Sequence, residues 1–165
     1  MNKKMKQIMD WRAALWSGLI AGFVFLFLNI FLVPILLGGN MWVIIRLFSS
    51  IFFGQIILAP PATYNLPALI MCIITNLVLS ELYTILIAFV LHKYGLITGI
   101  IGGALFGLAI YLINFYSLSY FFPWFFVMRS WPFVLTHVLF GAIAGGVYEL
   151  LEVEEFEPIE IVIGD

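Results

Sequence analysis

Charged residues are scarce in this sequence of 165 residues: 10% are Asp, Glu, Lys or Arg, whereas 64% are hydrophobic. An ordinary soluble domain has roughly 25% charged and about 45–50% apolar residues, so this composition excludes a soluble globular protein. A helix that crosses a bilayer needs about 20 apolar residues, so the chain has room for about four or five such helices with short connections. No second domain fits beside them.

Cysteine and histidine are nearly absent. The single cysteine, Cys72, has apolar neighbours that indicate a buried, unreactive thiol. On the helices predicted below, the heights of His92 and His137 differ by about 20 Å at about 1.5 Å per residue, which is too far for both to bind one haem iron. A single-histidine haem site, or one shared between two copies, stays open. No His, Cys or acidic cluster has zinc-like spacing. We predict no cofactor and no metal site.

Basic patches and catalytic triads are also missing. Beyond the N-terminal cluster Lys3, Lys4, Lys6, basic residues are isolated, so we expect no nucleic-acid binding. No serine has a histidine and an acid that sequence alone can pair with it as an activated nucleophile. We therefore predict that the protein is not an enzyme.

Four apolar stretches fit transmembrane helices, at residues 11–37, 66–91, 96–115 and 132–151. The first follows a basic segment (1–10) and exceeds the apolar core of a signal peptide, about 7–15 residues, so we interpret it as an uncleaved span. An acidic tail, 152–165, ends the sequence. The predicted fold class is all-α: a polytopic membrane bundle forming one integral membrane domain.

The stretch 41–59 is ambiguous, because it is apolar enough to span a membrane. However, Arg46, Ser49, Ser50 and Gly54 fall on one helical face. This pattern favours a helix that lies in the interface or packs on the bundle, and hence four spans over five. With four spans, five of the seven Lys and Arg lie on the side of both termini, which predicts cytoplasmic termini. With five spans, the number of Lys and Arg residues on each side barely changes.

Glu81 lies near the middle of the span 66–91. A carboxylate there costs about 2.5–3.5 kcal/mol on insertion scales and usually faces a partner or water. One interpretation is proton or cation handling, with Thr84 and His92 on the same side. The other is a protonated acid hydrogen-bonded to a neighbouring helix.

A second polar group is predicted nearer the outer side. It comprises Asn29, Asn76, Ser80, Asn114 and His137. Interhelical hydrogen bonds, about 0.6 kcal/mol each in one well-studied case, are a sufficient explanation for such residues. The alternative is a ligand or ion site in which His137 matters most, because only its side chain titrates near neutrality. Glu81, His137, Asn29, Asn76 and Asn114 form the candidate intramembrane polar site.

Glycines recur at every fourth position in the third and fourth predicted spans. They are Gly95, Gly99, Gly103 and Gly107 in the third, and Gly141 and Gly145 in the fourth. Small residues at this spacing allow two helix backbones to approach closely. We predict tight helix packing, either within the chain or between chains.

The aromatic segment 120–131 is predicted to anchor the outer interface, as Trp and Tyr commonly do. In an alternative interpretation it forms one wall of a lipid or quinone pocket. Arg129, Trp124 and Trp131 are the candidate residues of this outer-interface site, with His137 as a further polar contact.

The acidic tail is interpreted as a solvated segment. Alternatively it is a docking strip for a basic partner, to which Ile159, Ile161 and Ile163, alternating with Glu160 and Val162, would add a strand.

Four segments carry a resemblance to known proteins: WRAALWSGLIAG (11–22), PPATYN (60–65), NFYSLSYFFPWF (114–125) and THVLFG (136–141). With them the chain resembles a group of small, uncharacterised bacterial membrane proteins with four spans, some of which carry a sodium:proline symporter label. The resemblance would cover nearly the whole chain, and it implies a location in a bacterial inner membrane. Established symporters have discontinuous helices around a midplane site, and no internal repeat here supplies one.

The sequence favours a non-catalytic multi-pass membrane protein, either an accessory subunit of a membrane complex or a homo-oligomer. The expected partners are the lipid bilayer and other membrane subunits or further copies of the chain. The main alternative is a small oligomeric transporter or a proton- or cation-conducting protein that uses Glu81 and His137. A third hypothesis is lipid or quinone binding at the outer aromatic segment.

Overall fold

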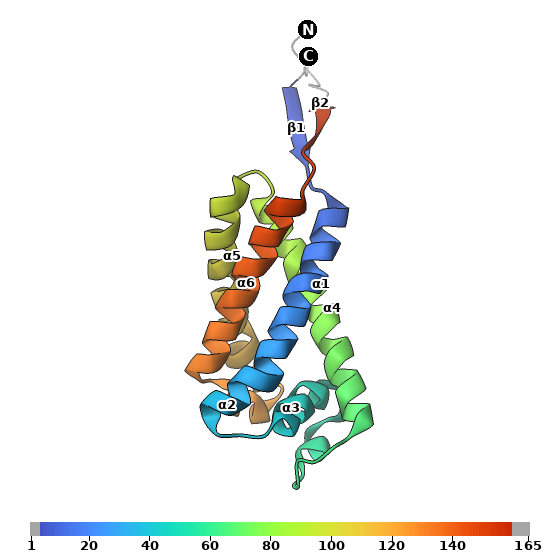
Figure 1. Cartoon of the computed structure of the whole chain (residues 1–165), viewed down its shortest axis with the longest axis vertical. Coiled ribbons are helices and arrows are strands. Elements are labelled where there is room, and N and C mark those ends of the chain that lie inside the picture. Colours follow the sequence, from blue (N-terminus) through green and yellow to red (C-terminus); the bar gives the residue numbers. More distant parts are fainter. Residues whose placement is uncertain (1–3, 160–165) are drawn as a thin grey trace.

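The computed structural model describes residues 4–159, and within them the chain forms a helical bundle (Figure 1). Its long helices are α1 (Trp11–Phe27), α4 (Leu66–Leu91), α5 (Gly95–Leu112) and α6 (Trp131–Leu151). The π-helical turn η1 (Leu28–Leu32) and the short helix α2 (Val33–Leu37) continue α1, and the π-helical turn η3 (Ile113–Ser117) continues α5.

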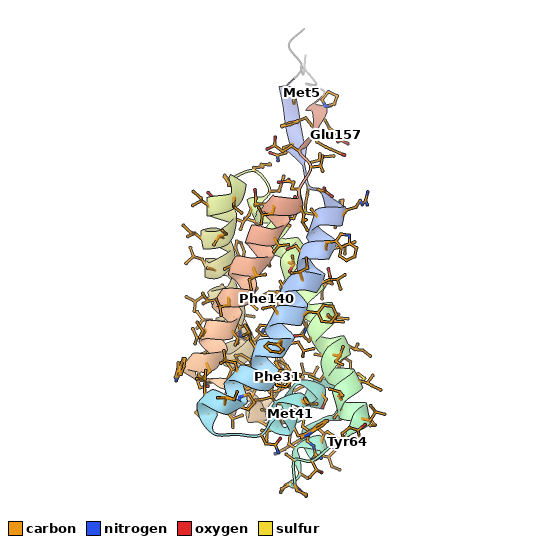
Figure 2. The ribbon with its side chains drawn as sticks, viewed as in Figure 1. Met5, Phe31, Met41, Tyr64, Phe140 and Glu157 are labelled. Carbon is orange, nitrogen blue, oxygen red and sulfur yellow. The ribbon has the colours of Figure 1, made fainter. Side chains whose placement is uncertain are left out.

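Four continuous helices are long and apolar enough to cross a membrane: Trp11–Leu37, Leu66–Leu91, Gly95–Ser117 and Trp131–Leu151. The predicted fold class, a helical bundle with four spans, is confirmed. The outward faces of these helices carry apolar side chains, such as Phe89, Ile97 and Leu105, which are 66%, 74% and 64% exposed. Soluble monomers rarely expose apolar patches of this extent, so these faces fit a lipid environment. Figure 2 shows the side chains along the bundle.

The stretch 41–59 forms the helix α3 (Met41–Phe53) and the 3₁₀ turn η2 (Gln55–Leu58). With 13 residues α3 is about 20 Å long, which is too short to cross a bilayer. It packs across the end of the bundle opposite the termini (Figure 1). Its polar face points into the protein, where Arg46, Ser49 and Ser50 are buried. The Arg46 guanidinium donates to the carbonyl oxygens of Ala59 at 2.9 Å and Thr63 at 3.1 Å, and so holds the return loop.

Short polar side chains cap the starts of α1, α3 and α4: Asp10, Asn40 and Asn65 each accept a hydrogen bond from a backbone N–H group of the first turn. The Asp10 carboxylate accepts hydrogen bonds from the backbone N–H groups of Arg12 and Ala13 at the start of α1, and from that of Val153 near the other terminus. Partial burial acts to raise its pKa, but these three donors together hold the pKa of Asp10 below its ordinary value. The hydrogen bonds to the ionised Asp10 carboxylate therefore stabilise the folded protein at neutral pH, and this stabilisation is lost as the pH falls through the lowered pKa.

The π-helical turn η1 ends two residues before Pro34, the second residue of α2. Pro34 lacks a backbone N–H, so an ordinary helical hydrogen bond to the carbonyl of Ile30 is impossible. The wider turn adapts the chain locally, and Val33 N–H donates to the carbonyl of Leu28. The helix then ends at Gly38, whose φ of 65° is left-handed.

The closest helix contact joins α5 to α6 through glycine. A Cβ atom on Gly103 would lie 2.1 Å from the carbonyl oxygen of Gly141, and one on Gly145 would lie 2.1 Å from that of Gly99. In the same way, a Cβ atom added to Gly107 would lie 2.0 Å from the carbonyl oxygen of His137. These glycines therefore pack α5 directly against α6 of the same chain.

Gly95 does not share this packing role. A Cβ atom on it would meet nothing within 4 Å, but its φ is 76°. L-residues rarely adopt that conformation, so Gly95 is suited to the tight turn between α4 and α5.

Both ends of the described chain meet in a two-stranded antiparallel ribbon that projects from the bundle (Figure 1). Strand β1 (Lys4–Ile8) pairs with β2 (Glu155–Ile159), with Lys6 opposite Glu157. The start of the acidic tail is therefore paired with the chain's own basic N-terminus instead of extending alone. Glu160, Ile161, Val162 and Ile163 lie outside the described residues.

A hydrogen-bond network fixes the ribbon to the bundle. Gln7 Nε2 donates to the backbone carbonyl of His92 at 2.9 Å and to Glu152 Oε1 at 3.3 Å. The Tyr148 hydroxyl donates to the same carboxylate at 2.9 Å and accepts from the backbone N–H of Asp10. Burial raises the pKa of Glu152 despite these hydrogen bonds.

We predict that Gly103→Ala destabilises the protein by about 1–3 kcal/mol, because the added methyl group meets a backbone carbonyl that cannot move aside. The free energy of unfolding in detergent micelles measures this. Gly102→Ala on the same helix is the control, since its Cβ would meet only the end of the flexible Leu91 side chain. Equal stability of the two variants would contradict the close α5–α6 contact.

Candidate functional site

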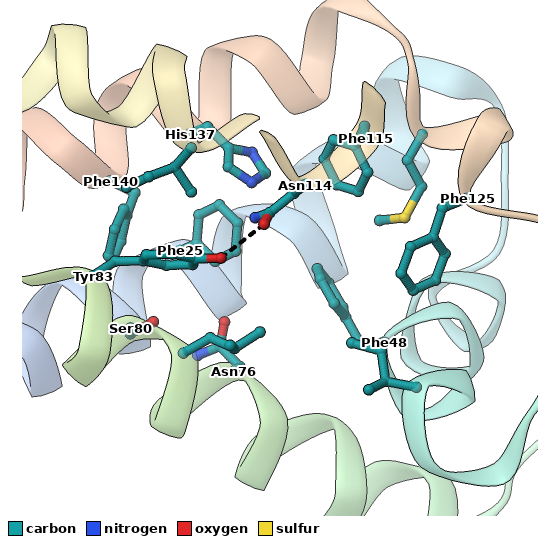
Figure 3. A pocket seen from close by; sticks show the side chains of 14 residues that line it. Phe25, Phe48, Asn76, Ser80, Tyr83, Asn114, Phe115, Phe125, His137 and Phe140 are labelled. Carbon is teal, nitrogen blue, oxygen red and sulfur yellow. Dashed lines mark hydrogen bonds between the residues drawn. The ribbon is translucent and has the colours of Figure 1, made fainter. Parts of the chain in front are cut away.

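A cavity lies inside the bundle near the end that carries α3 (Figure 3). Its volume is about 60 Å³, whereas one water molecule needs about 10–15 Å³. Most of its wall is aromatic or aliphatic, with a few polar side chains. The lining residues are Phe25, Phe48, Ile51, Asn76, Leu79, Ser80, Tyr83, Ile110, Asn114, Phe115, Phe125, Met128, His137 and Phe140.

The walls of the cavity are unequally covered. The lining residues on α1 and α6 are buried, whereas Ile51 on α3, Leu79 and Tyr83 on α4, and Asn114 on η3 are half-buried. Helices α4 and α5 diverge from their hairpin toward this end, while α5 stays against α6 (Figure 1). The less covered side of the cavity therefore lies between α3, α4 and the end of α5.

One hydrogen bond bridges that side. The Tyr83 hydroxyl on α4 donates to Asn114 Oδ1 at 2.7 Å (Figure 3). The π-helical turn η3 contains Asn114 and sets the direction of its side chain. Because its oxygen accepts from Tyr83, the amide nitrogen of Asn114 is the group left to donate into the cavity.

His137 lies among aromatic rings with its imidazole at the cavity. Its ring stands edge-to-face with Phe25, Phe115 and Tyr111, at centroid distances of 4.8, 5.3 and 5.6 Å. Nδ1 lies 2.7 Å from the carbonyl oxygen of Phe133 one helical turn earlier. A carbonyl only accepts, so Nδ1 carries the proton and Nε2 of the neutral ring is an acceptor.

Asn76 contributes a second acceptor. Its amide nitrogen donates to the carbonyl of Gly22 on α1 at 2.9 Å, and its side chain is 3% exposed. Oδ1 is buried and has no partner among the described residues. An unpaired buried acceptor costs about 1–3 kcal/mol, so this oxygen is a point at which a bound molecule gains affinity.

Glu81 points elsewhere. It does not line the cavity, and its carboxylate lies against Gly18 on α1, where an added Cβ would be 2.5 Å from Oε2. Both carboxyl oxygens are buried without a hydrogen-bond partner among the described residues. Glu81 and His137 therefore do not form one site.

Asn29 is also separate from the cavity. Its amide nitrogen donates to the carbonyl of Phe25 at 2.8 Å, and its oxygen accepts from Thr136 at 3.4 Å. These partners make it an internal link between α1 and α6. Of the five candidate intramembrane residues, the structure brings three together: Asn76, Asn114 and His137.

The outer-interface candidates have two different roles. Arg129 donates from Nε to the carbonyl of Phe115 at 2.7 Å and also bonds Ser119, and its guanidinium lies over the Tyr116 ring at 4.5 Å. Trp124 donates from Nε1 to Ser50 at 2.8 Å and so ties this segment to α3. Trp131 is 61% exposed. Of the two turns in this segment, η4 (Leu118–Tyr120) and η5 (Pro123–Met128), η5 contributes Phe125 and Met128 to the wall of the cavity.

Tyr83 is the functional candidate that the sequence interpretation missed. It lies three residues after Ser80 and seven after Asn76, so all three fall on one helical face. This spacing was available in the sequence. The phenylalanines of the wall carried no comparable signal, because 17 are spread along the chain.

The fold and the cavity define a class: a helical bundle with four membrane-length helices and an internal aromatic cavity with a few convergent polar groups. No protein-family model, no curated protein and no solved structure matches this chain. Among the described residues, no group of three His, Cys, Asp or Glu side chains is placed to hold a metal ion.

We predict that the Tyr83–Asn114 hydrogen bond contributes about 0.5–1.5 kcal/mol to stability. A double-mutant cycle with Tyr83→Phe and Asn114→Leu, measured by unfolding in detergent, gives the coupling free energy. Tyr94→Phe, at an exposed ring in the α4–α5 turn, should change nothing. A coupling free energy of zero would contradict the bridge across the cavity's less covered side.

Proposed function

We propose that this is a non-catalytic multi-pass membrane protein that binds a small, lipid-soluble molecule in the cavity between its helices. The observation that carries the proposal is a mostly apolar cavity with two acceptors on facing walls, Asn76 Oδ1 and His137 Nε2, that have no hydrogen-bond partner among the described residues. Ligand sites are typically apolar pockets with a few well-placed polar groups that fix orientation.

The position of the less covered side supports entry from the lipid. It lies between helices whose outward faces are apolar, so a ligand dissolved in the bilayer reaches it without crossing water. The enclosed volume of about 60 Å³ is far smaller than a whole lipid. We infer that a polar head group enters and that any apolar remainder extends between α3 and α4.

Because Glu81 and His137 lie apart, the arrangement favours ligand binding in the cavity over proton or cation conduction through this pair. A proton or cation path through both residues would need a polar connection, but Glu81 faces Gly18 and its carboxylate has no hydrogen-bond partner among the described residues. The glycine faces of α5 and α6 are used within the chain. Association with other membrane subunits or further copies, as an accessory component, would therefore use other surfaces.

We propose a bacterial inner membrane as the location, with both termini in the cytoplasm. Four spans place the two termini on one face together with Lys93, and basic residues concentrate on the cytoplasmic side. The ribbon formed by β1 and β2 would then extend into the cytoplasm, and α3 would lie at the outer face.

We predict that the protein purified in mild detergent carries a lipid-soluble organic molecule, identified by mass spectrometry after solvent extraction. Leu79→Trp, which fills the cavity, should lose it. Val78→Trp is the matched control, because the neighbouring Val78 side chain faces outward and is 53% exposed. Retention of the molecule by Leu79→Trp, or its absence from the wild type, would count against the proposal.

The orientation predicts opposite labelling of the two ends. In a Cys72→Ser background, Tyr64→Cys should react with a membrane-impermeant maleimide on intact cells, whereas Tyr94→Cys should react only after permeabilisation. The two tyrosines are 67% and 62% exposed and lie at opposite ends of α4. The reverse pattern would overturn the proposed topology.

A further inference from the structure

The polar groups that line the cavity differ in whether they can donate or accept a hydrogen bond. His137 Nδ1 is committed to Phe133, and Asn76 Nδ2 is committed to Gly22. Of the other polar atoms that line the cavity, His137 Nε2 and Asn76 Oδ1 can only accept, whereas the Ser80 hydroxyl, which has no partner among the described residues, can donate or accept. An occupant that pairs with these two acceptors must therefore supply hydrogen-bond donors.

The two acceptors stand on different walls. His137 belongs to α6 and Asn76 to α4, and Figure 3 shows their side chains on opposite sides of the cavity. Beside His137, the free amide nitrogen of Asn114 donates. A hydroxyl group on the His137 side can therefore donate to Nε2 and accept from Asn114 at once.

The remaining wall indicates the body of the ligand. The rings of Phe25, Phe115, Phe125 and Phe140 surround the space between the polar groups, with Phe25 and Phe140 edge-to-face at a centroid distance of 5.4 Å. Aromatic rings pack favourably in offset or edge-to-face arrangements, so a planar ring suits this wall. A dry cavity that binds benzene has about 150 Å³. With about 60 Å³ enclosed, a ring would lie partly in the opening beside Leu79 and Tyr83.

We propose that the cavity selects lipid-soluble phenols over their ethers and over quinones. A hydroquinone, with hydroxyl groups on opposite sides of one ring, carries one donor for each of the two acceptors. The oxidised quinone has only acceptor oxygens, which would face Asn76 Oδ1 and His137 Nε2 without a proton between them. This inference rests on the proposed ligand-binding function.

The test is equilibrium binding to the purified full-length protein in detergent, followed by Trp fluorescence or calorimetry. The first pair of probes is 4-decylphenol and 4-decylanisole, which differ only in methylation of the hydroxyl group. We expect the phenol to bind at least about fivefold more tightly, because the ether cannot donate. The second pair is decylhydroquinone, kept reduced under anaerobic conditions, and decylbenzoquinone. We expect the hydroquinone to bind more tightly than the quinone.

The outcomes separate the two proposals. If none of the four probes binds, the ligand-binding function fails together with this inference. If phenol and ether bind equally, or if the quinone binds more tightly than the hydroquinone, ligand binding stands and the donor requirement is overturned. If the protein prefers the phenol to its ether but does not prefer the hydroquinone to the quinone, the site is assigned to simple phenols.

His137→Phe locates the preference within the site. The phenyl ring keeps the aromatic wall but removes Nε2, so the preference for 4-decylphenol over 4-decylanisole should fall toward onefold while the anisole still binds. An undiminished preference in this variant would remove His137 from the site. The comparison of ligands in the wild type needs no variant, so the proposal stays testable even if His137→Phe does not fold.

Discussion

The contact of two helix backbones at the glycines of α5 and α6 is the constraint on which the rest of the structure depends. Glycine lets the two backbones meet directly, with the carbonyl of Gly141 occupying the space that a side chain at Gly103 would need. Because α5 is held against α6 along its length, it diverges from α4 below their shared turn. The end segments α3 and η5 lie at that divergence, and together with the long helices they line the cavity.

The polar side chains in this structure have different functions despite their similar appearance in the sequence. Arg46 and Arg129 bind backbone carbonyls and hold the connecting segments that close the bundle. Asn29 links two helices, with its amide nitrogen donating to Phe25 and its oxygen accepting from Thr136. Among the described residues, Asn76, Ser80, Asn114 and His137 keep hydrogen-bonding capacity at the cavity, so unused capacity, and not polarity alone, distinguishes the candidate site.

Hydropathy and local pattern predicted the fold well. Runs of apolar residues located the four long helices, and the polar face at Arg46 correctly favoured a short helix over a fifth span. The site was predicted less well, because hydropathy does not specify which faces of different helices meet. Glu81 is the plainest case: its sequence setting resembles that of Asn76, yet it turns toward Gly18. The pairing of β1 with β2 was also beyond reach, since two five-residue segments more than a hundred residues apart carry no mutual signal.

The central claim is that His137 offers an unprotonated Nε2 to a ligand hydroxyl inside the cavity. Nitrogen-15 NMR of the imidazole rings tests it most directly, with His92→Gln leaving His137 as the one labelled histidine. We predict an Nδ1–H tautomer without ligand and an upfield shift of Nε2 when 4-decylphenol is added, with no such shift for 4-decylanisole. An Nε2–H tautomer, or an Nε2 signal that both probes leave unchanged, would contradict the claim.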